Sequence, residues 1–155
     1  MILQTDTICA LITPPGRGAI GVIRISGTKT FEIISKIFMP ARKNISTSEF
    51  EHQHIYFGKI VDQKDIIDEV LVSIFKAPAT YTGEDVAELS CHGSGYIRQR
   101  ILQLIMQSGA VMAKPGEFTM RAYLNGKMDL AQAEAVADII AAENSISHHA
   151  AMQQM

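Results

Sequence analysis

Two charged side chains interrupt segments that otherwise have the pattern of apolar β-strands. Arg24 follows Ile20 and Val22 at every second position, and Glu88 follows Val86 in the same way. An ionised group without a partner costs several kcal/mol in an apolar environment. The two charges therefore predict one of two arrangements, and the sequence does not decide between them. They form a structural ion pair, or they share a pocket with a ligand that offers both hydrogen-bond donors and acceptors.

Two glycine-containing turns match phosphate-binding loops only in part. Pro14–Gly18 precedes a strand rather than a helix, which favours a tight turn. The Gly-Ser-Gly segment at 93–95 opens a helix, but Arg98 stands where the dinucleotide-binding motif requires its third glycine. Gly58-Lys59 and Gly126-Lys127 lack the Ser or Thr that completes a P-loop. The chain is therefore not expected to hydrolyse nucleoside triphosphates by that route.

Cys91 is expected to be a small core residue and His52 and His54 to be exposed to solvent, whereas one lysine suggests a ligand. Cys91 and His92 are neighbours on a predicted strand and point to opposite faces, so they do not form a nucleophile–base pair. His52 and His54 share a face but lack a third metal ligand. Lys127 lies just before a predicted helix, where the helix dipole disfavours a cation and an anionic ligand would explain it. We predict no catalytic residue and no metal site.

The elements that must position these residues alternate between strands and helices. Alternating and β-branched apolar residues predict strands at 5–13, 19–26, 54–61, 66–76, 85–91 and 110–113. Helical spacing predicts helices at 29–38, 93–108, 118–124 and 130–151. Thr28 is the expected N-cap of the first helix, and Asp129 with Gln132 is the expected capping box of the last. Residues 39–51 are predicted to form a loop. The pattern indicates an α/β (α+β) fold.

Composition and charge exclude several classes of protein. The chain has 155 residues, of which 47% are hydrophobic and 19% charged, so it has the composition of a globular protein. Residues 119–155 hold two basic and four acidic side chains, a net charge of −2, which leaves the first 118 residues neutral. No basic run is available for nucleic-acid binding by bulk electrostatics. The two cysteines and the absence of a targeting or membrane segment predict a soluble cytoplasmic protein.

Several segments together identify a known family. They are Asp6-Thr7-Ile8, PPGRGAIGVIRISG at 14–27, YTGEDVAELSCHGS at 81–94 and PGEFTMRAYLNGKMDLAQAEAVADII at 115–140. In this order, they resemble the N-terminal domain and the start of the helical domain of the MnmE/TrmE family of tRNA-modification GTPases. The likeness spans nearly the whole chain and is weakest at residues 39–65.

The resemblance implies a fold and a ligand. It implies a mixed β-sheet with packed helices over residues 1–118, similar to the folate-binding domain of aminomethyltransferases. Residues 119–155 would be the start of an all-α domain that is truncated here. The family's N-terminal domain binds 5-formyltetrahydrofolate and forms the homodimer. Its folate-binding residues correspond to Arg24, Glu88 and Lys127: Glu88 would accept from the pterin N–H groups, and Arg24 and Lys127 would contact polar ring atoms or the glutamate tail.

The resemblance also implies functions that belong to the rest of the family protein. A GTPase domain that uses Mg²⁺ and K⁺ and a C-terminal cysteine motif would lie beyond Met155. With the FAD-containing partner MnmG/GidA, the family protein adds an aminomethyl or carboxymethylaminomethyl group to the wobble uridine of certain tRNAs. We therefore expect the present chain to bind folate and dimerise without GTPase activity of its own. Two alternatives remain, a free-standing folate-dependent one-carbon transferase and a pure dimerisation scaffold.

Overall fold

The computed structural model describes residues 6–143 and 145–155, which form two compact units. The first unit contains residues up to Thr80 together with Glu84–Ala113, and the second contains Tyr81–Gly83 together with Lys114–Met155. Within these ranges no helix is both long and apolar enough to cross a lipid bilayer.

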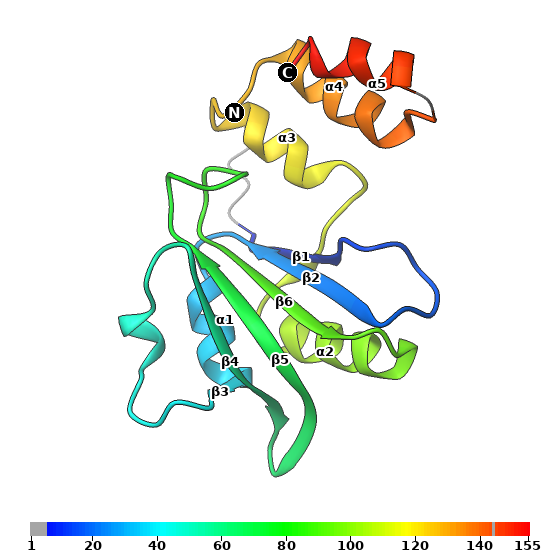
Figure 1. Ribbon diagram of the computed structural model, residues 1–155. Coiled ribbons are helices and arrows are strands. Elements are labelled where there is room, and N and C mark those ends of the chain that lie inside the picture. The colour runs from blue at the N-terminus through cyan, green and yellow to red at the C-terminus, as the bar shows by residue number, and fades with distance from the viewer. Residues whose placement is uncertain (1–5, 144) are drawn as a thin grey trace. The chain divides into compact units, whose positions relative to one another are not determined.

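The first unit is a seven-stranded mixed sheet with two helices, α1 and α2, on one face (Figure 1). The strand order is β3-β4-β5-β6-β2-β1-β7, and every neighbouring pair is antiparallel except β1 with β7. This confirms the predicted fold class. The strands are β1 (Ile8–Leu11), β2 (Ile20–Ser26), β3 (Phe38–Pro40), β4 (His54–Asp62), β5 (Asp65–Phe75), β6 (Val86–His92) and β7 (Val111–Met112). The helices are α1 (Thr30–Ile37) and α2 (Gly95–Gln107).

The hydrophobic core lies between the sheet and these two helices. Alternate residues of the central strands, such as Ile23 on β2 and Leu89 on β6, are fully buried there with Ile33 of α1 and Ile101 of α2. Because successive side chains of a strand point to opposite faces, the residues between them lie on the face that α1 and α2 do not cover. Arg24 and Glu88 both occupy that second face.

Two local predictions in this unit were wrong. The N-cap of α1 is Lys29 rather than Thr28, and its side chain makes no capping hydrogen bond. The backbone N–H of Lys29 donates to the hydroxyl of Thr7 at 2.9 Å, so a residue distant in sequence holds the start of the helix. The predicted loop at 39–51 contains the end of β3 and a short 3₁₀ helix, Thr47–Glu49, which the next residue, Phe50, anchors by its burial.

The second unit is helical and consists of α3 (Glu117–Leu124), α4 (Leu130–Ala141) and α5 (Ser145–Met152) with the loop 81–83. The predicted capping box of α4 is confirmed, with Asp129 Oδ1 accepting from the Gln132 N–H at 2.8 Å. The single helix predicted at 130–151 is wrong, because the chain becomes extended at Ala142 and α5 packs beside α4 (Figure 1). This pairing buries Ala135 and Ala151.

Candidate functional site

The centre of the candidate site is an ion pair between neighbouring strands. Arg24 of β2 and Glu88 of β6 are directly opposite each other in the register. Both Nε and Nη2 of Arg24 lie 2.9 Å from Oε1 of Glu88. The two side chains are 19% and 26% exposed, so they are partly withdrawn from water but reachable from outside. The ion pair that the sequence left as one alternative is therefore present.

One oxygen of this pair remains available. Arg24 uses Oε1 of Glu88 twice, and Oε2 accepts no hydrogen bond from any residue in the described ranges. A carboxylate has about four lone-pair sites and gains from further charge-assisted hydrogen bonds. The site can thus accept an N–H donor from a ligand without breaking the ion pair.

The residues that flank the ion pair are small. In the cross-strand register, Ala10 of β1 lies beside Arg24, and Ser73 of β5 lies beside Glu88. Cross-strand neighbours share a face of the sheet. The row across four strands is therefore small, basic, acidic, small. The side chains beside the two charges are therefore a methyl and a hydroxymethyl group. The sequence alone did not reveal these flanking residues, because they become neighbours only through strand pairing.

Lys127, the third residue that the resemblance implies, belongs to the second unit. Its backbone N–H donates to the Ala122 carbonyl at 2.8 Å, just after the end of α3. Its aliphatic carbons pack against the backbone of Gly83, where a Cβ would lie 3.4 Å from Cγ and Cδ. Asn125 Nδ2 donates to the Thr82 carbonyl at 2.7 Å. The loop 81–83 therefore fixes the segment from which Lys127 projects.

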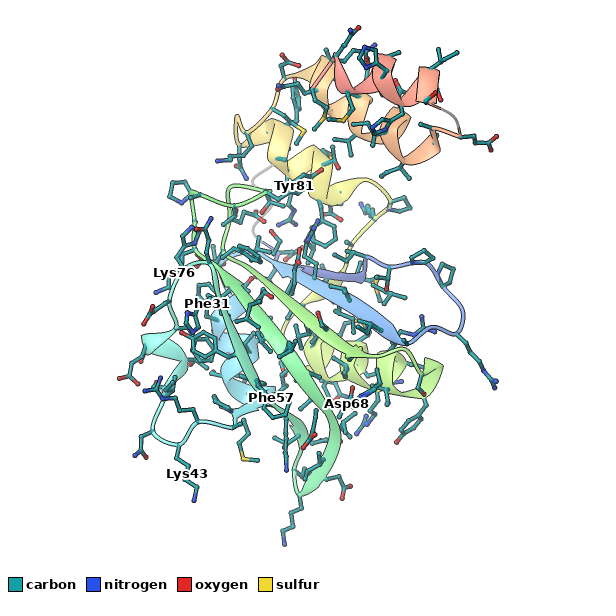
Figure 2. The ribbon with its side chains drawn as sticks, in the orientation of Figure 1. Phe31, Lys43, Phe57, Asp68, Lys76 and Tyr81 are labelled. Carbon is teal, nitrogen blue, oxygen red and sulfur yellow. The ribbon has the colours of Figure 1, made fainter. Side chains whose placement is uncertain are left out.

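A second carboxylate, which sequence reasoning missed, orients a histidine. Asp68, labelled on β5 in Figure 2, accepts the backbone N–H of His92 at 2.8 Å and lies 2.7 Å from its Nδ1. The Asp68 side chain is 7% exposed, and that of His92 is 69% exposed. Asp68 occurs two positions before the buried Val70, so the strand alternation could have indicated its inward position.

Cys91 is a core residue, as predicted, and Cys9 lies in the core as well. Cys9 and Cys91 are free and buried. Burial raises the pKa of the Cys9 thiol to about 11. Burial also raises the pKa of Cys91, with a smaller contribution from the charge of Asp68. Neither thiol is poised as a nucleophile. Among the described residues, no cluster of three or more His, Cys, Asp or Glu side chains could hold a metal ion.

The family model and the relatives described below all indicate the same protein family. The family model described as the N-terminus of the GTP-binding protein TrmE matches residues 7–127. A protein named tRNA modification GTPase MnmE from Bacteroides thetaiotaomicron is 53% identical over 153 residues, or 99% of this chain. Proteins of the same name from Flavobacterium johnsoniae and Cytophaga hutchinsonii are 53% and 54% identical over 154 and 152 residues, or 99% and 98% of this chain.

The chain spans only part of these relatives. It covers 33% of the Bacteroides and Flavobacterium proteins and 32% of the Cytophaga protein.

Proposed function

We propose that this chain, which belongs to the family of the N-terminus of the GTP-binding protein TrmE, is the folate-binding and dimerisation module of a tRNA-modification GTPase. Residues 1–118 would be the folate-binding and dimerisation domain, and residues 119–155 would begin the helical domain. The family match supports the assignment to this kind of protein.

The observation that carries folate binding is the half-used Glu88 carboxylate on the sheet face that α1 and α2 do not cover. A pterin ring presents an amino group and a ring N–H side by side, which suits a carboxylate. Glu88 would accept these donors through Oε2 while Oε1 holds Arg24. Arg24 and Lys127 would supply positive charge to polar ring atoms or to the glutamate tail. The ligand is 5-formyltetrahydrofolate or a related tetrahydrofolate.

The proposed activity of the whole protein depends on regions outside this chain. Those regions would bind GTP with Mg²⁺ and K⁺. The whole protein would act in the cytoplasm. With an FAD-containing partner of the MnmG/GidA type, the protein would add an aminomethyl or carboxymethylaminomethyl group at C5 of the wobble uridine of certain tRNAs. The folate held by this module would donate the carbon. The present chain would not hydrolyse GTP.

Calorimetric titration of this chain with 5-formyltetrahydrofolate tests the ligand. The variants Glu88→Gln and Arg24→Gln should each weaken binding by about 1–3 kcal/mol, or roughly five- to 150-fold, the usual loss for a charged hydrogen-bond partner. Glu69→Gln is the matched control, because Glu69 forms a cross-strand ion pair with Lys59 elsewhere on the same sheet. That variant should bind folate like the unaltered chain.

Two outcomes would reject the folate assignment. If the unaltered chain gives no heat and no displacement with the folate, Arg24 and Glu88 form only a structural pair and the module is a scaffold. If Glu88→Gln binds as tightly as Glu69→Gln, the carboxylate does not contact the ligand. Turnover of a one-carbon unit by this chain alone would instead favour a free-standing transferase.

The homodimer is supported by exposed apolar side chains on the sheet face that α1 and α2 do not cover. Ile55 and Phe57 of β4 and Leu71 of β5 are 59%, 51% and 44% exposed. Phe57 is labelled in Figure 2, and Leu71 is its direct cross-strand neighbour. Burying these residues against a second copy would release water from apolar surface. Light scattering should give about twice the chain mass of 17.0 kDa, and Phe57→Glu should return it to the monomer value. A monomer at high concentration would reject this assignment.

A further inference from the structure

A separate cavity in the first unit lies where the turn 16–18 meets the turn 93–95. Its volume is about 650 Å³, and Tyr96 and Arg98 of α2 complete its lining. The sequence singled out both turns, and the folate assignment uses neither of them.

Backbone contact between the two turns builds the floor of this cavity. A Cβ at Gly93 would lie 2.0 Å from the carbonyl oxygen of Gly18, so no side chain could be accommodated at position 93. The Gly93 N–H donates to the Ala19 carbonyl at 3.0 Å. The glycines therefore allow the backbones of the two turns to approach closely. The basic side chains of Arg17 and Arg98 line the cavity beside them.

The lining of the cavity has an excess of positive charge. Arg17 is exposed and Arg98 is half-buried, and neither forms an ion pair with any carboxylate in the described ranges. No acidic side chain lines the cavity. The stem of Arg98 lies against Gly21, since a Cβ at Gly21 would stand only 2.7 Å from the Arg98 Cδ. Its Nη2 reaches to 4.0 Å from the Cβ position of Gly95, the first residue of α2.

The position of Arg98 is electrostatically unfavourable unless an anion is present. It is the fourth residue of α2, where the helix dipole disfavours a positive charge. The N-cap residue Ser94 makes no side-chain capping hydrogen bond, so backbone N–H groups of the first turn also lack that acceptor. Two arginines and these N–H groups would all gain from the same negatively charged ligand. The arginines distinguish this cavity from an ordinary helix end.

We propose that the cavity between Arg17 and Arg98 binds a phosphate group. Guanidinium groups bind phosphate oxygens through paired hydrogen bonds, and two arginines from different elements can hold one phosphate from two sides. Tyr96, which is 71% exposed at the cavity, offers an aromatic face beside it for a base. The phosphate is that of a mononucleotide or that of an RNA backbone.

Nuclear magnetic resonance titration of this chain tests the proposal. The backbone amide signals of residues 93–95 should move saturably with inorganic phosphate and with uridine 5′-monophosphate. Sodium chloride at equal ionic strength should not move them. Arg17→Gln and Arg98→Gln should each weaken phosphate binding at least about tenfold, the loss expected for a charged hydrogen bond. Arg42→Gln is the matched control, since Arg42 is an exposed arginine that does not line this cavity.

A short RNA without terminal phosphates distinguishes the two sources of the phosphate group, a mononucleotide and an RNA backbone. Saturable binding of this RNA assigns the site to an RNA backbone, and binding of the mononucleotide alone assigns it to a terminal phosphate. The proposal is overturned if phosphate at about 10 mM, beyond the millimolar range of a weak site, produces no saturable shift. It is also overturned if chloride acts equally or if Arg17→Gln, an exposed substitution that should fold, behaves like Arg42→Gln. Arg17→Gln should leave folate calorimetry unchanged, so this proposal and the folate assignment fail independently.

Discussion

The backbone contact at Gly93 gives a sharp prediction for the substitution Gly93→Ala. The added Cβ would lie 2.0 Å from the Gly18 oxygen and 2.5 Å from its carbonyl carbon, and both atoms belong to the backbone. An ordinary contact needs about 3.4 Å, so one turn must move by roughly 1.4 Å. Overpacking of this kind costs about 1–3 kcal/mol, and loss of the hydrogen bond to Ala19 adds about 1 kcal/mol. We expect the first unit to lose about 2–4 kcal/mol of stability.

Hydrogen exchange of amides in β2 and β6 measures this loss, because these strands belong only to the first unit. Exchange through unfolding of this unit should accelerate roughly 30- to 1,000-fold. Gly95→Ala is the matched control, since its Cβ would meet only the end of Arg98 at 4.0 Å, and alanine favours a helix. The reasoning is refuted if Gly93→Ala exchanges at the unaltered rate or if Gly95→Ala is equally damaging.

Four further predictions concern other parts of the chain. Cys9 and Cys91 should resist iodoacetamide at pH 8 in the folded chain and react in denaturant, as read by mass spectrometry, because burial raises both pKa values. Since the folded pKa of Cys9 exceeds its unfolded value of 9.0, the stability that its protonated form supports should be complete below pH 9 and lost as the pH rises to about 11. Asp129→Ala should destabilise α4 by about 1 kcal/mol, measured as faster amide exchange there. Gly83→Ala should shift the segment that carries Lys127 and weaken folate binding in calorimetry, because Gly83 has a φ of +80° and a Cβ there would lie only 3.0 Å from the Cβ of Asn125.

Each of these predictions has a contrary result. Rapid labelling of the folded chain at pH 8 would contradict burial as the control on the thiols, and a Cys9→Ala variant with the same alkaline profile would contradict the assignment to Cys9. Unchanged exchange in Asp129→Ala would mean that the capping box contributes nothing. Folate binding by Gly83→Ala at the original affinity would separate Lys127 from the ligand.

Strand pairs could be predicted well because their signal is local. The segment 54–61 and the segment 66–76 have alternating apolar residues around a short polar link, and they form β4 and β5 with only small differences at the ends. The α4 capping box was also readable, since a side-chain acceptor and an amide three residues apart suffice to form it.

Features set by distant residues could not be predicted. Residues 130–151 are rich in alanine and contain no Gly or Pro, so local propensity favours one helix. The break at Ala142 arises because folding back lets Ala135 and Ala151 be buried between two short helices. The start of α1 is similar, since the hydroxyl of Thr7, a residue distant in sequence, holds it by accepting from the Lys29 N–H.

The sequence indicated which charged residues form the candidate site, but not how these residues are arranged. The charges of Arg24 and Glu88 stood out against their strands, and the structure places them opposite each other. Which oxygen of Glu88 remains available, and that Ala10 and Ser73 flank the ion pair, depend on the strand order. That order is a property of the whole sheet.

The strand order also determines when the first unit can be completed during synthesis. Ser26 ends β2 and pairs with Val86, sixty positions later. The strand β1 pairs with β7, which begins only at Val111. At translation rates of about 5–20 residues per second, the ribosome needs roughly 3–12 s to supply the segment between Ser26 and Val86. During that interval the nascent β2 exposes an unpaired edge to other chains. This protein should therefore depend most on chaperones when it is synthesised on crowded polysomes, where nascent chains lie close together.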